Sequence, residues 1–355
     1  MIRSFRGLKM LKCDDEGLRI ASRKLLAGQV GVIPTDTVYG LAAHPSFDSA
    51  VSRLYSIKER ELKKPIALLC DSAESASRFL GVKAAAFGEK YWPGALTVIG
   101  DGEGVRIPDH KWTRDLIALC GGALRVTSAN MAGRSPATDA PEALASVGLS
   151  ADFVVDGGVS PVSAASTVIK VFQSGRLETL RQGPIKPLVL ASGSPRRAKI
   201  LEAHGVFFEV IKSDAHEVQY DDDPERTVVE NALAKGAKGN VLSADTIVWF
   251  ENRIYGKPKD ESEAKSFLKR LSGNTHTVFT GVAYDGKVEV VKSEVKFRNL
   301  TDDEIDSYVK TVRPLDRAGA YDIDESGEEI VLSYTGSYEN IMGLPVEPLK
   351  KWGIL

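Results

Sequence analysis

Two stretches of this sequence decide its organisation: Pro34–Leu41, which reads Pro-Thr-Asp-Thr-Val-Tyr-Gly-Leu, and Leu188–Arg197, which reads Leu-Val-Leu-Ala-Ser-Gly-Ser-Pro-Arg-Arg. In both, an apolar strand leads directly into polar residues. Each stretch is followed by its own series of polar motifs, and the two share no pattern with each other. The sequence therefore predicts two unlike modules on one chain.

Length and composition fit a globular protein of two domains. A chain of 355 residues is longer than one ordinary core, and 43% hydrophobic and 26% charged residues are usual for soluble proteins. The formal net charge of −2 predicts no global basic field for nucleic acid. Cys13, Cys70 and Cys120 form no CxxC pair, which disfavours disulfides and cysteine-rich zinc sites. We expect a cytoplasmic protein without a signal peptide or a membrane segment.

Hydrophobic periodicity predicts alternating helices and strands in both halves. In the first half we expect helices over 15–26, 49–58 and 73–79, and strands over 30–33, 66–70, 96–99, 124–127, 153–155 and 167–171. In the second half we expect helices over 195–204, 224–238 and 261–271, strands over 188–191, 206–211, 241–244 and 247–250, and a hairpin over 277–297 that turns at Asp285-Gly286. The proline-bearing stretch 181–187 is interpreted as a semi-rigid linker between domains 1–186 and 187–355.

Two acidic segments are interpreted as helix caps. Thr301-Asp-Asp-Glu304 has the pattern of a capping box. The run Asp221-Asp-Asp-Pro-Glu225 could hold a metal ion, but we favour an N-cap with Pro224 at the first helical position.

Several polar motifs of the first half follow strands or helices. Thr35, Asp36, Thr37 and Tyr39 come after a strand, where open α/β sheets bind ligands. The cations at positions 58, 60, 63 and 64 exceed what a helix C-terminus needs, which indicates an anionic ligand. Three further motifs lie at 92–97, 105–110 and 127–130, although the last could be a simple turn.

Together with Ser166-Thr-Val168 and Leu180-Arg-Gln-Gly183, these motifs resemble, in order, the YrdC-type threonylcarbamoyl-AMP synthase family over about residues 8–186. The resemblance implies a twisted α/β sheet around a basic cleft. It also implies an enzyme that condenses L-threonine, bicarbonate and ATP into threonylcarbamoyl-AMP and releases pyrophosphate. The product would pass to a separate tRNA threonylcarbamoyl transferase for the t6A modification.

Matching positions give each residue an expected role within this resemblance. Threonine would be bound by Thr35, Arg106 and Ser166, and ATP by Lys58, Arg60, Ser128, Asn130, Thr138 and Arg181. Such a site acts by orientation and charge stabilisation, without a nucleophile. The sequence departs from the family at Glu61, which replaces a proline. A different module also occupies the place of the extra domain that covers the site in longer members, so closure of the cleft stays open.

The second half opens with an anion-binding pattern. Ser194 and Pro195 suit a helix start, but Arg196 and Arg197 follow in the first turn, where cations oppose the helix dipole. A bound anion would explain this placement, because free N–H and guanidinium groups would converge on it. We therefore expect a phosphate at this helix N-terminus.

With further motifs at 243–246, 256–258, 272–281, 319–321 and 336–345, the second half resembles the Maf family of nucleotide pyrophosphatases over about residues 187–355. The resemblance implies an ITPase-like α/β domain. It would hydrolyse nucleoside triphosphates, or their deoxy forms, to the monophosphate and pyrophosphate with a divalent metal ion, magnesium or manganese.

By matching positions, the resemblance makes Asp245 the general base, with Lys257 and Glu217 as further catalytic residues. Phosphates would be bound by Ser194, Arg196, Arg197, Lys235 and Lys257, and base specificity would involve Arg197, Thr246 and Asp324. The alternatives are a strand-end turn for Asp245 and a solvated helix face for Lys235. Asp324 stands where many pyrimidine-hydrolysing members have glutamine, and an ionised carboxylate only accepts hydrogen bonds, which disfavours thymine or uracil specificity.

Two hypotheses of different classes follow. In the first, the chain is a bifunctional cytoplasmic enzyme. In the second, one half is a non-catalytic module that binds RNA or nucleotide, or a regulatory protein of septum formation. The first is favoured by the presence of Lys58, Arg60, Ser128, Asn130, Asp245 and Lys257.

Overall fold

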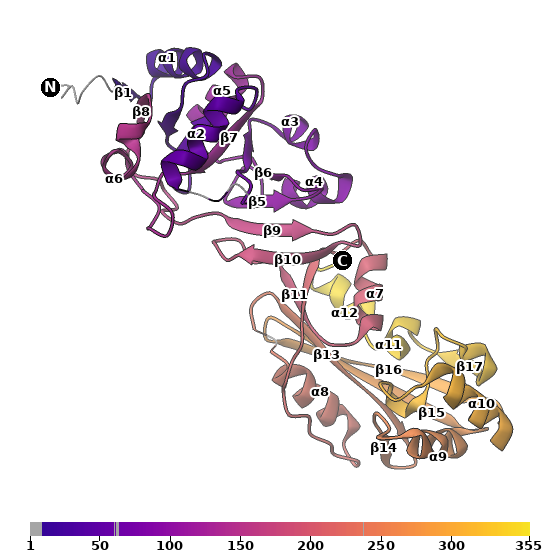
Figure 1. Ribbon diagram of the computed structural model, residues 1–355. Helices are drawn as coiled ribbons and strands as arrows, with labels where there is room; N and C mark the ends of the chain where they lie inside the picture. Colours follow the sequence, from indigo (N-terminus) through magenta and orange to yellow (C-terminus); the bar gives the residue numbers. More distant parts are fainter. Residues whose placement is uncertain (1–8, 60, 62–63, 237) are drawn as a thin grey trace. The chain divides into compact units, whose positions relative to one another are not determined.

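The chain folds as two units, Met1–Lys186 and Pro187–Leu355, in a computed structural model that describes residues 9–59, 61, 64–236 and 238–355 (Figure 1). Within these residues no helix is both long and apolar enough to cross a lipid bilayer.

The N-terminal unit is built on a mixed sheet. In order of pairing its strands are β1 (Lys9–Lys12), β8 (Phe153–Asp156), β2 (Gly31–Ile33), β3 (Gly40–Ala43), β7 (Ala123–Ser128), β4 (Leu68–Cys70), β6 (Gly104–Arg106), β5 (Leu96–Ile99), β9 (Thr167–Val171) and β10 (Arg176–Arg181). Its helices are α1 (Asp15–Leu26), α2 (Asp48–Lys58), α3 (Ala73–Ser77), α4 (Val82–Glu89), α5 (Lys111–Leu119) and α6 (Ala140–Ser146).

Helices cover both faces of this sheet. On β2, Val32 packs in one core with α2 and α6, whereas the next residue, Ile33, packs in another with α1 and α5. Successive strand residues point to opposite faces, so the apolar run over β2 serves both cores. Helix α1 begins where the Asp14 side chain accepts a hydrogen bond from the Gly17 backbone N–H at 2.8 Å.

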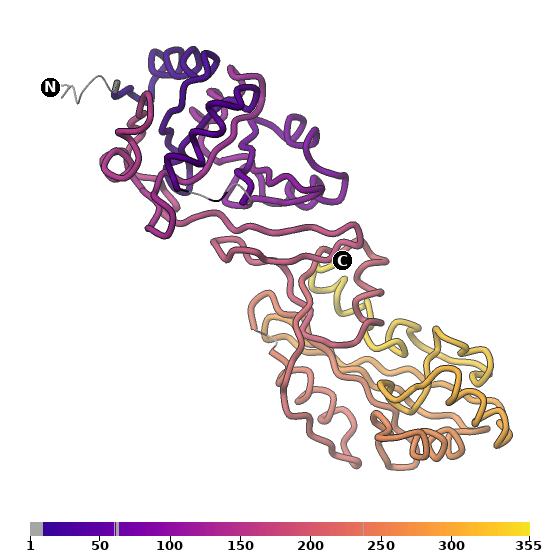
Figure 2. Tube along the Cα trace, in the orientation of Figure 1, coloured from indigo at the N-terminus to yellow at the C-terminus, as the bar shows by residue number. Residues whose placement is uncertain are grey.

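The C-terminal unit has a second mixed sheet. In order of pairing its strands are β12 (Phe208–Ile211), β11 (Leu188–Ala191), β13 (Val241–Phe250), β15 (Thr275–Tyr284), β16 (Lys287–Phe297) and β17 (Val331–Thr335), with β14 (Arg253–Tyr255) on the distal part of β13. Its helices are α7 (Pro195–Ala203), α8 (Pro224–Ala234), α9 (Glu261–Leu271), α10 (Asp302–Val312), α11 (Tyr338–Met342) and α12 (Val346–Lys351). The Cα trace in Figure 2 can be followed through the long β15–β16 hairpin.

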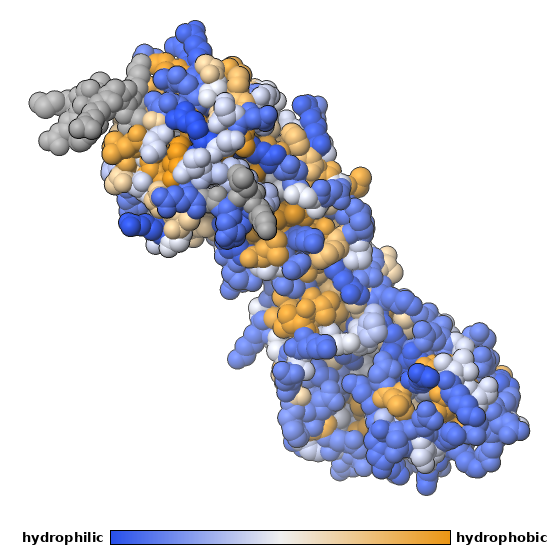
Figure 3. All heavy atoms as spheres, in the orientation of Figure 1, coloured by the Kyte–Doolittle hydropathy of each residue, from blue (hydrophilic) through white to orange (hydrophobic). Residues whose placement is uncertain are grey.

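Helix α8 lies on one face of the C-terminal sheet, and α9 and α10 lie on the other. Ile247 of β13 packs against Val228 of α8, whereas Val248 packs in the core with α9 and α10. This alternation along β13 decides where the polar residues at its centre point. On the face seen in Figure 3, this unit is mostly hydrophilic, with small apolar patches.

Many predicted elements are confirmed, including the helices 15–26 and 261–271, the strands 96–99 and 167–171, and the hairpin turn at Asp285-Gly286. The capping box at Thr301 and the N-cap at Asp223 with Pro224 are also confirmed. In the acidic run, Asp223 accepts the capping hydrogen bond from the Arg226 N–H at 3.0 Å, Asp221 accepts from the Ile254 N–H at 3.1 Å, and Glu225 pairs with Lys292.

Three predictions about the second half need correction. The strands expected over 241–244 and 247–250 are one strand, β13, and Asp245 lies at its centre rather than at an end. Helix α8 ends at Ala234, so Lys235 is its C-cap residue. Ser194 is the N-cap residue of α7, but its side chain makes no capping hydrogen bond. The hydrophobic pattern also did not predict β1, β3, β6, β10, β14, β17, α4, α5, α6, α11 and α12.

Candidate active sites

The N-terminal unit contains a cavity of about 500 Å³ at the ends of several strands. Its lining includes five residues with predicted roles: Thr35, Arg106, Ser128, Ser166 and Arg181. Arg106 ends β6, Ser128 ends β7 and Arg181 ends β10, while Thr35 follows β2 and Ser166 precedes β9. The sheet thus brings together side chains that are up to about 150 residues apart in the sequence.

Arg106 is a buried cation of this cavity that the protein holds in place. The side chain is buried, and its guanidinium donates to Asp36 Oδ1 at 2.5 Å, to Thr37 Oγ1 at 2.6 Å and to the Gly94 carbonyl at 2.9 Å. Burial lowers the pKa of Arg106, and the charge and hydrogen bond of Asp36 oppose this shift. A guanidinium fixed in this way presents its remaining N–H groups in one orientation, which suits a carboxylate ligand.

Ser166 and Arg181 form one connected group beside this cavity. Arg181 donates from Nε to the Ser166 carbonyl at 2.9 Å and from its terminal nitrogen to Ser166 Oγ at 3.0 Å. Ser166 Oγ also lies 2.8 Å from Thr97 Oγ1. The antiparallel pairing of β9 with β10 creates this contact.

Lys58 and Asn130 lie behind the lining rather than in it. Lys58 is buried, and its ammonium donates to the carbonyl of Ser128, to the Asn130 carbonyl at 2.6 Å and to Asn130 Oδ1 at 3.1 Å. Lys58 therefore holds the segment that positions Ser128. Thr138 donates to Glu142 Oε2 at 3.1 Å, next to the start of α6, and it is not among the described lining residues.

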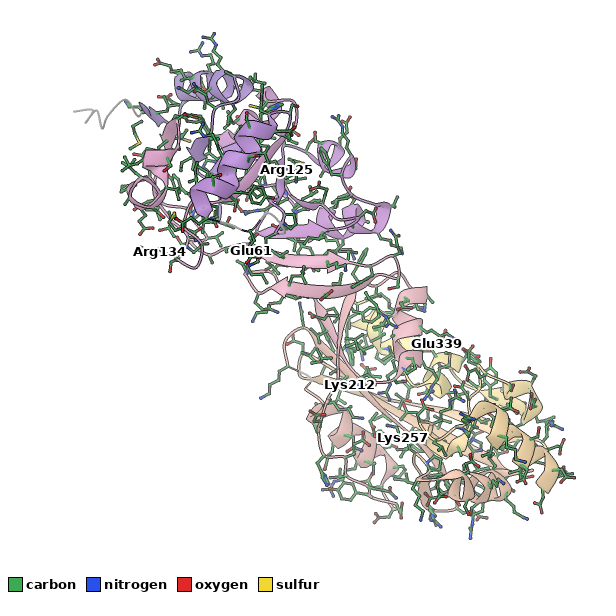
Figure 4. The ribbon with its side chains drawn as sticks, viewed as in Figure 1. Glu61, Arg125, Arg134, Lys212, Lys257 and Glu339 are labelled. Atoms are coloured by element: carbon green, nitrogen blue, oxygen red, sulfur yellow. The ribbon has the colours of Figure 1, made fainter. Side chains whose placement is uncertain are left out.

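The segment 58–64 carries the cations that were predicted to bind an anionic ligand. Arg60, predicted to bind ATP, lies outside the described residues, as does Lys63. Glu61, which replaces the family's proline, is exposed and lies 3.7 Å from Lys64 Nζ. Figure 4 labels Glu61 in the N-terminal unit.

The C-terminal unit contains its own cavity, of about 510 Å³. Most of the residues predicted for this half line it: Ser194, Arg196, Arg197, Glu217, Lys235, Asp245, Thr246 and Lys257. Figure 4 labels Lys257 together with Lys212, a lining residue that the sequence analysis did not select.

The cavity forms where the pairing of β13 changes partner. On one edge of β13, β11 pairs with Val241–Ser243 and β14 pairs with Val248–Phe250. Asp245 and Thr246 lie between these two pairings and point to opposite faces of the sheet. Asp245 contacts Asn231 and Lys235 at α8, and Thr246 contacts Arg197 of α7. The gap between β11 and β14 thus opens beside both side chains.

Lys235 joins the two predicted catalytic carboxylates. Its ammonium lies 2.6 Å from Asp245 Oδ1 and 2.9 Å from Glu217 Oε1. Burial raises the pKa of Glu217, but the hydrogen bond and charge of Lys235, with the charges of Lys257 and Arg197, outweigh it and lower the pKa overall. Lys235 is only 11% exposed, so the alternative of a solvated helix face is wrong. The strand-end alternative for Asp245 is wrong as well, because it lies buried at the centre of β13.

Arg197 lines this cavity, and its guanidinium is hydrogen-bonded to the protein. Its guanidinium donates to the carbonyls of Gly343 and Ala244 at 2.8 Å each, to Ser192 Oγ at 3.1 Å and to Thr246 Oγ1 at 3.0 Å. Burial lowers its pKa, which Asp245 opposes. Protein acceptors therefore account for this arginine at a helix N-terminus without any bound anion.

Asp324 is not among the lining residues that the structure describes. Its Oδ2 accepts a hydrogen bond from Lys199 Nζ at 2.9 Å, and its Oδ1 lies 3.4 Å from Tyr338 Oη. The lining does include its neighbours Asp322 and Ile323.

Asn231 is a site residue that the sequence analysis missed. It is buried, and its Nδ2 donates to Asp245 Oδ2 and to the Val218 carbonyl at 3.0 Å each, while its Oδ1 accepts from the Val218 N–H at 2.7 Å. One amide thus fixes Asp245 and the segment next to Glu217. The available signal was its position four residues before Lys235, on the same face of α8.

We expect Asn231→Leu to lower the rate of C-terminal catalysis about tenfold and the stability of this unit by about 1–3 kcal/mol, because Leu has a similar volume but leaves buried polar partners unpaired. Steady-state kinetics and thermal unfolding measure the two effects. Glu230→Gln, on the exposed side of the same helix, is the control and should change the rate less than twofold. Equal rates for the two variants would contradict a positioning role for Asn231.

His276 supports the wall of the C-terminal cavity from behind. Its Nε2 lies 3.0 Å from Oη of Tyr321, a lining residue, and its ring packs edge-on against Phe297 and Tyr321. Burial lowers the pKa of His276 to about 3, so the folded state keeps it neutral at neutral pH.

We expect this unit to lose stability as the pH falls from about 6.5 towards 3, because unfolded His276 binds a proton that the folded state does not. One such proton lowers the free energy of unfolding by about 1.4 kcal/mol for each pH unit of acidification. Amide hydrogen exchange of β15 between pH 6.5 and 5 measures the slope. His276→Gln should flatten this slope relative to the native chain. An unchanged slope would show that His276 does not cause the loss of stability at low pH.

Glu217 and Asp245 are the described side chains best placed to hold a divalent metal ion. Both carboxylates approach the same ammonium within 2.9 Å, so they can also approach one metal ion together. Magnesium is commonly held by one or two carboxylates together with substrate phosphates. The residues present therefore fit magnesium, with phosphate oxygens completing its coordination.

Comparison with known protein families gives two matches that divide the chain. Residues 187–352 match a family model described as Maf-like protein. Residues 23–183 match the Sua5/YciO/YrdC model, which is described as telomere recombination. The chain therefore joins a Sua5/YrdC-type domain to a Maf domain.

Relatives and solved structures fall into the same two groups. A dTTP/UTP pyrophosphatase of Bacillus cereus is 44% identical over 177 residues, which cover 46% of this chain and 87% of that protein. A dTTP/UTP pyrophosphatase of Bacillus anthracis is also 44% identical, with 93% of its length covered. P. abyssi Sua5 complexed with L-threonine aligns with a TM-score of 0.48 and 24% identity, covering 56% of this chain and 62% of that one. E. coli YciO aligns with a TM-score of 0.47 and 20% identity, covering 50% and 97%.

Proposed function

The chain belongs to the Maf family through residues 187–352 and carries a Sua5/YrdC-type domain over residues 23–183, and we propose that it is a bifunctional enzyme that uses a nucleoside triphosphate in each unit. One observation carries this proposal: each unit has its own cavity of about 500 Å³, in which residues predicted for that family's reaction converge.

The N-terminal unit condenses L-threonine, bicarbonate and ATP into threonylcarbamoyl-AMP and releases pyrophosphate. Arg106, held by Asp36, binds the threonine carboxylate, and Thr35 and Ser166 supply hydroxyl groups beside it. Arg181 and Ser128 bind the nucleotide, while Lys58 and Asn130 fix the segment of Ser128. The product is passed to a tRNA threonylcarbamoyl transferase for the t6A modification.

The C-terminal unit hydrolyses a nucleoside triphosphate to the monophosphate and pyrophosphate. Asp245 is the base that takes the proton of the attacking water. Lys235, Lys257 and Arg196 face the cavity and hold phosphate oxygens, whereas Arg197 supports Thr246 and the loop of Ser192. The dTTP/UTP pyrophosphatases that match this half make these two nucleotides the first candidates, although Asp324 stands at the base-reading position.

A divalent metal ion, most simply magnesium, would be held by Glu217 and Asp245 in this unit. When bound, it would neutralise phosphate charge and lower the pKa of coordinated water. Lys235 keeps the two carboxylates close together in the metal-free site.

Pyrophosphate release by the intact protein tests both halves. A panel of nucleoside triphosphates that includes ATP, dTTP and UTP is assayed with magnesium, with and without threonine plus bicarbonate. We expect release from ATP that requires threonine and bicarbonate, and release from a second nucleotide that requires neither and stops when EDTA removes the metal. Absence of release in both arms would contradict the proposal and favour a binding module.

A further inference from the structure

Asp322 is a buried carboxylate of the C-terminal cavity that the proposed mechanism does not use. It is 5% exposed, and its backbone N–H donates to Oη of the buried Tyr308 at 3.0 Å. Because the backbone is fixed in this way, the carboxylate has a defined position beside the lining residues Arg196 and Arg317.

The two oxygens of Asp322 have different partners. Oδ1 accepts hydrogen bonds from the backbone N–H groups of Asp324 at 2.8 Å and Glu325 at 3.3 Å, which closes a turn. Oδ2 lies 3.0 Å from Arg317 Nε and 3.5 Å from a terminal nitrogen of Arg196. One side chain therefore contacts both a turn and a pair of cations.

Two carboxylates lie between this pair of cations. Asp316 lies 3.3 Å from Arg196 and 3.5 Å from Arg317, but its side chain is 59% exposed, whereas that of Asp322 is 3% exposed. Two guanidinium groups that approach the same point repel each other, and the buried charge of Asp322 offsets this repulsion with the least screening by solvent. Both arginines are largely buried, at 18% and 11% exposure, so solvent screens them weakly. Each guanidinium keeps further N–H groups that can face phosphate oxygens in the cavity.

The turn closed by Asp322 carries the lining residue Ile323 and Asp324, which the family resemblance places at the base-reading position. Asp324 is held from its other side by Lys199 at 2.9 Å. A shift of the Asp322 side chain would therefore displace this turn, with the lining residue Ile323, and the two lining arginines together.

We propose that Asp322 is a positioning residue that sets the phosphate-binding Arg196 and the base-reading turn at Asp324 in one arrangement. This inference rests on the proposed pyrophosphatase function of the C-terminal unit. It makes base preference and triphosphate affinity depend on a single carboxylate.

Two substitutions separate the two contacts. Asp322→Asn keeps an oxygen for the turn but places an uncharged amide against the arginines, so the KM for every triphosphate should rise about tenfold with the base preference unchanged. Asp322→Ala removes both contacts, so the KM should rise and the ratio of kcat/KM between dTTP and the other nucleotides should change at least threefold. Glu328→Gln is the control, because Glu328 is exposed, follows this turn and is not among the described lining residues, and it should change neither by more than twofold.

A merely structural role predicts a different result. Loss of folded protein lowers kcat for all nucleotides equally and leaves the KM and the base preference unchanged, and that outcome would overturn the inference. If Asp322→Ala does not fold, Arg196→Gln combined with Asp322→Asn decides: the double variant should have nearly the KM of Arg196→Gln alone, and additive effects would overturn the inference. If the native chain hydrolyses no triphosphate, the proposed function itself has failed.

Discussion

Asp245→Asn is expected to lower C-terminal pyrophosphate release by about 10²–10⁴-fold, the usual contribution of a general base. Asparagine has the same shape but cannot accept a proton. Its oxygen can still pair with one of the two partners, Lys235 Nζ at 2.6 Å or Asn231 Nδ2 at 3.0 Å. Nucleotide binding should therefore survive while turnover is lost.

The measurement is kcat for release from dTTP and UTP, together with calorimetric binding of the same nucleotides. Asp285→Asn is the matched control, because Asp285 is exposed at the turn of the β15–β16 hairpin, outside the cavity lining. It should retain native kinetics. Unchanged turnover in Asp245→Asn would show that Asp245 is not the general base.

Arg106→Lys is expected to lower threonine-dependent pyrophosphate release from ATP by about 10–100-fold, because hydrogen bonds to charged groups contribute about 1.5–3 kcal/mol. Lysine keeps a positive charge beside the buried Asp36, so the fold is retained. It lacks the planar fork that binds a carboxylate with two parallel hydrogen bonds. The effect should appear mainly as a higher KM for threonine.

Arg114→Lys is the control for this substitution. Arg114 lies on α5, pairs with Asp109 at 3.2 Å and is not among the described lining residues. It should leave the KM for threonine within twofold of the native value. A native KM in Arg106→Lys would show that Arg106 does not contact threonine.

Local signals in the sequence predicted much of the fold. The caps at Asp223 and Thr301 and the turn at Asp285-Gly286 act within a few residues, so the starts of their helices and the hairpin were placed correctly. The interruption of the apolar pattern at Asp245 and Thr246 was misleading, because it comes from distant partners. β13 continues through these polar residues because α8 satisfies one side chain and Arg197 of α7 the other.

The sequence predicted which residues belong to the candidate sites, but it did not predict how their side chains are oriented or which partners they contact. A sequence cannot tell whether a buried cation faces the cavity or supports it. Lys58 and Arg197 each donate to two backbone carbonyls and to side-chain oxygens of the protein. Asn231 and Asp322 were missed because an amide on a helix and a carboxylate in a loop have no signal until the fold brings their partners together. The positions predicted for Lys235 and Asp245, by contrast, converge within 2.6 Å.

The central claim is that two separate active sites work on one chain. It is tested most directly by measuring pyrophosphate release from ATP by the Asp245→Asn protein, with and without threonine plus bicarbonate. The account predicts that threonine-dependent release continues at the native rate although hydrolysis of dTTP and UTP is lost. Loss of both activities from this single substitution would contradict it.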